Sequence, residues 1–163
     1  MHKIFAVLLA VIALIGCAKT ISPYGNHLTG MPSEIQVQLA TFAVNQLVNL
    51  YPPGRSRFEI QQPTPDQFGQ LLVKGLRDNG YAVQEFEPIQ DNTTPADTKA
   101  AAGGEPASAP GASQSYPLRY VVDQAGYSDL YGLNLLVGDQ SLAISYQYNN
   151  GELWHGGYWT RGH

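Results

Sequence analysis

The side chain with the most definite chemistry in this 163-residue sequence is that of Cys17, its only cysteine. One cysteine cannot form an internal disulfide or a multi-thiolate zinc site. Its neighbours indicate another use, because an apolar run at 4–15 follows Lys3, and Gly16 directly precedes the cysteine. A charged start, a short apolar core and a small residue before the cut form an export signal. As a helix the run would rise about 18 Å, short of the roughly 30 Å hydrocarbon core, so we predict a leader at 1–16 that is removed.

The four residues Leu14-Ile15-Gly16-Cys17 resemble the lipobox of bacterial lipoproteins. The resemblance implies a diacylglyceryl group on the Cys17 thiol, cleavage between Gly16 and Cys17, and acylation of the new amino terminus. Each buried methylene contributes about 0.8 kcal/mol and one chain holds only marginally, so two or three chains would anchor the protein stably. In enteric bacteria, lipoproteins retained in the inner membrane tend to have Asp directly after the lipidated cysteine. This chain has Ala18 there, and the absence of Asp favours the periplasmic face of the outer membrane. The alternative is an ordinary secretory leader that happens to end at a cysteine.

The remaining titratable side chains do not form a recognisable catalytic set. His155 and His163 could reach one metal ion, but a histidine at the end of the chain is a poor ligand, so we expect no metal site. Asp123 and Asp129 could act as general acid and base. The favoured interpretation is that they are structural carboxylates, one at the end of a strand and one in a turn. The nucleophile-elbow, zinc-protease, P-loop and dinucleotide motifs are absent from the sequence. We therefore predict no catalytic residue, no cofactor apart from the acyl chains on Cys17, and no small-molecule substrate.

Composition and charge exclude other classes of function. The formal net charge is −4, and the nine lysines and arginines are spread along the chain. Binding to phosphates needs a basic patch, so direct nucleic-acid binding is not expected. With 44% hydrophobic and only 13% charged residues, most of the chain should fold.

The predicted organisation is a leader followed by a tether and one domain. Residues 17–32 contain Ser, Gly, Asn and Pro without a period and predict a flexible tether behind the lipidated N-terminus. Residues 33–163 predict a single domain. Residues 90–115 lack large apolar side chains and predict a disordered loop inserted within that domain.

The first part of the domain predicts helix, strand, helix and strand. Apolar residues at three- and four-residue steps predict a helix over 33–51, with Ser33 as N-cap and Gln36 completing a capping box. A strand is expected at 57–61. A second helix should begin with Thr64 as N-cap and Pro65 as its first residue and end at Asn79-Gly80, before a strand at 81–86.

The last part of the domain predicts four antiparallel strands, at 118–123, 130–137, 141–148 and 152–160. The dipeptide Gly138-Asp139 and the tripeptide Asn149-Asn150-Gly151 are typical of hairpin turns between them. The fold class is therefore α+β: two helices packed on a mainly antiparallel sheet that includes a strand–helix–strand unit.

Aromatic residues concentrate in the last third of the chain, where seven of the ten tyrosines and both tryptophans lie. Core and cross-strand packing explains many of them. Tyr and Trp are also enriched where proteins contact one another, and a modest sheet cannot bury so many rings. The candidates for a protein interface are Tyr146, Tyr148, Trp154, Tyr158 and Trp159.

Taken together, the lipobox, the early Pro23-Tyr24-Gly25-Asn26 and the ending at 151–161, with its Gly-Tyr-Trp-Thr segment, resemble the TrbH family of lipoproteins. The resemblance covers the chain apart from 90–115. It implies a non-enzymatic component of a conjugative type IV secretion apparatus, which helps the outer-membrane complex assemble for plasmid transfer. The implied partners are other envelope proteins of that apparatus and the membrane itself, through the lipid on Cys17.

Two alternatives remain open at the level of sequence. The pattern of a helix followed by strand, helix and strand also suits a general envelope-binding lipoprotein, such as a cell-wall regulator or a pilotin-like factor. An envelope hydrolase is supported only by scattered acidic and histidine residues, and would require turnover that depends on Asp123 or His155.

Overall fold

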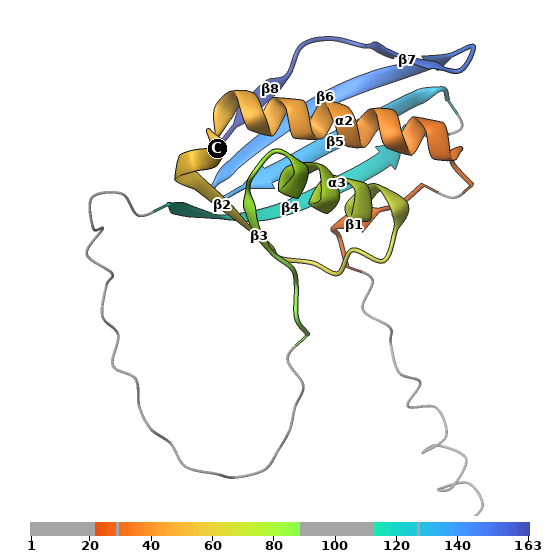
Figure 1. Ribbon diagram of the computed structural model, residues 1–163. Coiled ribbons are helices and arrows are strands. Elements are labelled where there is room, and N and C mark those ends of the chain that lie inside the picture. Colours follow the sequence, from red (N-terminus) through yellow and green to blue (C-terminus); the bar gives the residue numbers. More distant parts are fainter. Residues whose placement is uncertain (1–21, 29, 89–112, 127) are drawn as a thin grey trace, which may run out of the picture.

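The computed structural model describes residues 22–28, 30–88, 113–126 and 128–163 (Figure 1). The predicted leader, with Gly16 and Cys17, and most of the predicted loop at 90–115 lie outside the described residues. The described chain forms one mixed sheet with two helices, which confirms the α+β fold class.

The main path of the sheet has the strand order β3-β2-β4-β5-β6-β7, with β1 beside β4 and β8 beside β6. The pairs β1·β4, β2·β3 and β2·β4 are parallel, and the other pairs are antiparallel. The strands are β1 (Gly25–Asn26), β2 (Ser56–Ile60), β3 (Ala82–Gln84), β4 (Gln114–Gln124), β5 (Leu130–Val137), β6 (Gln140–Asn149), β7 (Glu152–His155) and β8 (Thr160–Gly162).

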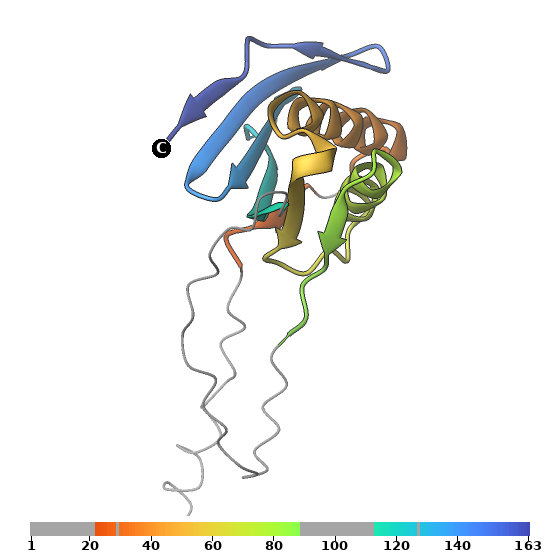
Figure 2. The same cartoon turned by 60° about the vertical axis from the view of Figure 1, so that its left-hand side comes forward.

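Both helices, α2 (Ser33–Leu50) and α3 (Gln67–Asp78), lie on the same face of the sheet (Figures 1 and 2). Their apolar stripes explain this placement, because alternate residues of the long strands are buried toward them while the residues between stay accessible. The core formed between helices and sheet includes Leu39, Leu47, Phe68, Leu72, Leu118, Leu133 and Leu135. Among the described residues, no helix lies on the opposite face of the sheet, and we call it the open face.

The start of α2 differs from the predicted capping box. Pro32 is the N-cap, and no side chain among the described residues makes a capping hydrogen bond there. Gln36 instead donates to the Met31 carbonyl at 3.3 Å and accepts from Asn26 Nδ2 at 3.3 Å. The Gln36 side chain binds the preceding segment because that segment lies against the helix. The capping-box rule considers only residues at the helix start and does not take such a contact into account. The end agrees closely with the prediction: the helix stops at Leu50, before Pro52, Pro53 and a short 3₁₀ turn (Pro53–Arg55).

The start of α3 lies two residues later than predicted, because Asp66 and not Thr64 is the N-cap. One Asp66 oxygen accepts from the Gly69 amide at 2.9 Å, and the other accepts from the buried Tyr120 hydroxyl at 2.6 Å. A carboxylate that binds both the helix N-terminus and a core tyrosine is favoured over a threonine cap. Burial first, and the neighbouring Asp66 second, raise the pKa of Tyr120, so its hydroxyl stays protonated and donates.

The strand–helix–strand unit is present as β2, α3 and β3. β2 pairs in parallel with β3, as expected for strands joined through a helix. Asn79 and Gly80 end the helix as predicted, and Gly80 has a φ of +85°, which glycine adopts without strain. β3 spans only Ala82–Gln84 rather than the predicted 81–86.

The predicted tether at 17–32 is not free along its whole length. Within it, β1 pairs with Val121 and Val122 of β4, and the His27 amide donates to the Val122 carbonyl at 2.8 Å. The Arg119 guanidinium lies 4.8 Å from the centre of the Tyr24 ring. These contacts attach the segment to β4. β2 pairs with β4 only as far as Leu118, so the same edge of β4 is available to β1 beyond that residue.

The predicted strand at 152–160 is two strands, β7 and β8, which both pair with β6. β4 also begins four residues earlier than the predicted 118, at Gln114, so the end of the expected loop at 90–115 belongs to the sheet. Its residues Gln114 and Ser115 pair with β2. The three hairpin strands at 130–137, 141–148 and the start of 152–160 lie close to their predicted positions.

Candidate interaction surface beside strands β7 and β8

A two-residue bulge separates β7 from β8. His155 pairs with Tyr146 and Thr160 pairs with Ala143, so residues 156–159 face only residues 144–145 of β6. The Gly156 amide donates to the Ser145 carbonyl at 2.8 Å. A Cβ at position 156 would lie 3.1 Å from that carbonyl oxygen, so glycine permits this close approach. The bulge projects Tyr158 into solvent.

The structure separates the five predicted interface residues by burial. Tyr158 is 94% exposed and Trp154 is 60% exposed, so both are free to contact another molecule. Tyr148 and Trp159 are partly buried against the core. Tyr146 is fully buried, and its prediction as an interface residue is wrong. Side chains alternate between the two faces of β6, and Tyr146 lies on the face toward the helices, where its ring packs in the core.

Tyr146 stacks on Phe42 of α2 with 5.0 Å between ring centres, and His155 packs against both rings. The Tyr146 hydroxyl has no hydrogen-bond partner among the described residues. Burial raises the pKa of this hydroxyl above its ordinary value, so it remains neutral. His155 is therefore an aromatic packing partner at the edge of the core.

We expect Tyr146→Phe to raise the free energy of unfolding by about 1 kcal/mol, because an unpaired buried hydroxyl carries a desolvation cost that phenylalanine lacks. Urea denaturation of both proteins measures the difference. The partly buried Tyr148→Phe is the matched control and should change stability less. A loss of stability in Tyr146→Phe would show that the hydroxyl has a partner.

On the open face, a pocket of about 540 Å³ lies beside the bulge. Three neighbouring positions cross its floor, because Asp123 of β4 pairs with Gly132 of β5, and Gly132 pairs with Ser145 of β6. Tyr158 also lines the pocket. Gly132 leaves space that the Asp123 carboxylate occupies, since a Cβ at position 132 would collide with Asp123 Oδ1. A second pocket, of about 570 Å³, lies beside the bulge and is lined by His155, Tyr158 and Trp159 among others.

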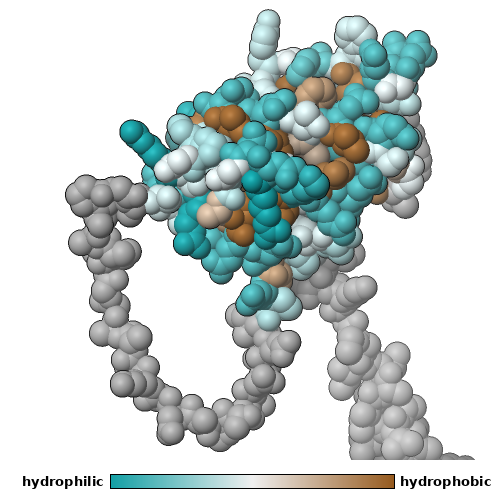
Figure 3. All heavy atoms as spheres, viewed as in Figure 1, coloured by the Kyte–Doolittle hydropathy of each residue, from teal (hydrophilic) through white to brown (hydrophobic). Residues whose placement is uncertain are grey.

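The helix-bearing face has a smaller hollow between α2 and α3, of about 330 Å³, lined in part by Val37, Val44 and Leu71. Apolar residues on this face are interspersed with polar ones, and no broad apolar area covers it (Figure 3). Gly75 permits the helices to approach, because a Cβ there would lie 2.8 Å from Val44 Cγ2. This hollow is a seam of helix packing.

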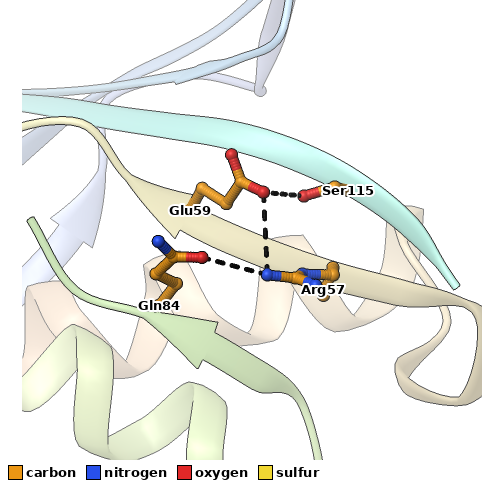
Figure 4. Close-up of polar contacts among 4 residues, drawn as sticks. All are labelled: Arg57, Glu59, Gln84 and Ser115. Atoms are coloured by element: carbon orange, nitrogen blue, oxygen red, sulfur yellow. Dashed lines mark hydrogen bonds and ion pairs between the residues drawn. The ribbon is translucent and has the colours of Figure 1, made fainter. Parts of the chain in front are cut away.

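A polar cluster lies across the parallel strands (Figure 4). Arg57 donates to Gln84 Oε1 at 3.0 Å and lies 3.7 Å from Glu59, which accepts from Ser115 Oγ at 2.5 Å. The Arg57 and Glu59 side chains are 41% and 35% exposed, and solvated pairs of this kind contribute at most about 1 kcal/mol. The cluster joins β2, β3 and β4 and needs no ligand to explain it.

The titratable residues singled out in the sequence take separate positions. Asp123 lies near the end of β4 and Asp129 in the following turn, while His155 ends β7 and His163 ends the chain. Among the residues that the structure describes, no three His, Cys, Asp or Glu side chains gather as a metal site requires. Within the same part of the chain, no helix combines the length and the apolar character needed to cross a bilayer.

The comparisons with known proteins give one match. No curated protein matches this chain. No solved structure matches it. The family model described as conjugal transfer protein TrbH matches residues 21–163, which is the whole described domain and the stretch between β3 and β4. Because the match covers most of the sequence, the chain belongs to the TrbH family of conjugal transfer proteins.

Proposed function

We propose that this conjugal transfer protein is a lipoprotein, anchored through acyl chains on Cys17 to the periplasmic face of the outer membrane. In this proposal it is a non-enzymatic assembly component of a conjugative type IV secretion apparatus. The family match over residues 21–163 carries the proposal, because it assigns the domain to conjugal transfer. The lipobox at 14–17 lies before the matched region and supports the anchor independently.

The position of β1 supports an anchor that holds the domain near the membrane. Eight residue steps separate Cys17 from Gly25, the first residue paired with β4. A chain of that length reaches at most about 29 Å when fully extended. The domain would therefore act close to the lipid surface, where the envelope part of a transfer apparatus assembles.

The exposed aromatic residues support an assembly role. Trp154 and Tyr158 are large, amphipathic side chains in solvent, and such side chains anchor many protein interfaces. Core packing of the described domain does not explain these two aromatic side chains, because most of the surface of each is exposed. We assign them to contact with another envelope protein of the apparatus.

We expect Trp154→Ala/Tyr158→Ala to reduce plasmid transfer strongly while leaving the amount of protein and its unfolding midpoint unchanged, since both side chains are exposed. Mating frequency, immunoblotting and thermal denaturation measure these quantities. Phe86→Ala removes an aromatic that is 38% exposed and lies beyond β3, and it serves as the control. Normal transfer by the double variant would remove these residues from the proposal.

The proposal as a whole is tested by an in-frame deletion in a donor strain, complemented with the wild-type gene. Transfer should be lost in the deletion strain and restored by complementation. Wild-type protein should co-sediment with outer membranes on a sucrose gradient. Normal transfer from the deletion strain contradicts the assembly role, and a protein found in the soluble periplasm contradicts the anchor.

A further inference from the structure

The pocket on the open face has the chemistry of a site for one basic side chain. Among its lining residues in the described part of the chain, Asp123 alone carries a formal charge. Its carboxylate makes no ion pair or hydrogen bond with the residues that the structure describes. An ionised carboxylate only accepts hydrogen bonds, so the partner that suits it is a hydrogen-bond donor or a cation.

The glycine opposite Asp123 determines where the carboxylate lies. Any side chain at position 132 would displace Asp123 Oδ1, while Gly132 has no positive φ that would otherwise require glycine. Glycine in the middle of a strand generally weakens it, so its use here needs another reason. The close approach of the carboxylate supplies that reason.

The rest of the pocket suits the flat face of a guanidinium group. Tyr158 lines it with a ring that is 94% exposed, and such a ring attracts cations. The neighbouring Ser145 and Asn134 offer further oxygen acceptors. On the same domain, Arg119 already lies 4.8 Å from the centre of the Tyr24 ring, which shows this type of contact within the chain.

We propose that this pocket binds an arginine side chain, or less well a lysine, of another protein of the transfer apparatus. The carboxylate of Asp123 pairs with the cation, and Tyr158 covers its apolar face. Arginine is favoured because its planar fork can both pair with a carboxylate and stack on a ring. The inference rests on the proposed function, whose partners are envelope proteins, and adds the chemistry that they present.

A binding experiment tests the site on the lipidated full-length protein in detergent micelles, with 3-fluorotyrosine at position 158. The probes are the peptides acetyl-Gly-Gly-Xaa-Gly-Gly-amide with arginine, lysine or glutamine, and an N-acetylglucosamine oligosaccharide. We expect the fluorine resonance to respond to arginine more than to lysine and not to glutamine. An equal response to glutamine, or a response to the saccharide alone, overturns the proposal.

The variants separate recognition from folding. Asp123→Asn should weaken the arginine response at least about tenfold, roughly the 1.4 kcal/mol that a factor of ten represents. Gly132→Ala should weaken it too while preserving the unfolding midpoint, because alanine fits the strand. Asp139→Asn, in the turn between β5 and β6, should bind as the wild type does. Unchanged binding by Asp123→Asn overturns the proposal.

A genetic experiment tests the same site in cells. Asp123→Lys should reduce transfer while the protein remains in the outer-membrane fraction. Selection for restored transfer should yield changes from Arg or Lys to Asp or Glu in another transfer protein. Normal transfer by Asp123→Lys, with Cys17→Ser still defective, would overturn this inference and leave the proposed function intact.

Discussion

Gly69→Ala is expected to lower the free energy of unfolding by about 2–4 kcal/mol, a sum of overpacking and of a disturbed hydrogen bond to a charged group. A Cβ at position 69 would collide with the Tyr120 hydroxyl and lie 2.9 Å from Thr64 Cβ. Tyr120 is fully buried and donates to Asp66, the N-cap of α3. The added methyl therefore disturbs the junction that docks the helix on β4. Urea denaturation measures the loss.

A double-mutant cycle identifies the cause of that loss. In a Tyr120→Phe background the hydroxyl is gone, so Gly69→Ala should cost less than it does in the wild type. Gly157→Ala is the control for a glycine with open space around it and should have little effect. Equal costs of Gly69→Ala in both backgrounds would contradict the assigned collision with Tyr120.

Cys17→Ser is expected to reduce plasmid transfer to the level of a deletion strain, because serine has no thiol to accept the diacylglyceryl group. Mating frequency and membrane fractionation measure the effect. The uncut leader could itself retain the protein on a membrane. A second variant therefore carries a cleavable secretory leader in place of 1–16, together with Cys17→Ser, and should appear in the soluble periplasm. Normal transfer by that soluble form would contradict a role for the anchor.

Much of the fold could be predicted because the spacing of apolar residues indicates which side chains are buried. Ile35, Leu39 and Leu47 recur at helical steps, and all three are buried as α2 docks on the sheet. The caps could not be predicted so well. Asp66 replaces Thr64 as the cap of α3 because Tyr120, far away in sequence, donates to the same carboxylate.

The candidate surface was only partly predictable. Tyr146 alternates along β6 with the buried Leu142 and Ile144, so the spacing of apolar residues was itself a signal that its ring lies in the core. The bulge had a signal in Gly156-Gly157, since paired glycines weaken a strand. The pairing of four residues against two depends on the register of β7 and β8 against β6, which local sequence does not encode. The row from Asp123 through Gly132 to Ser145 likewise exists only once three strands are aligned.

The most direct measurement of the central claim is the intact mass of the protein extracted from donor-cell membranes. The account predicts a chain that begins at Cys17 and carries the added mass of a diacylglyceryl group, with or without a further amide-linked acyl chain. A chain that retains residues 1–16, or one that is cut without added lipid, would contradict it.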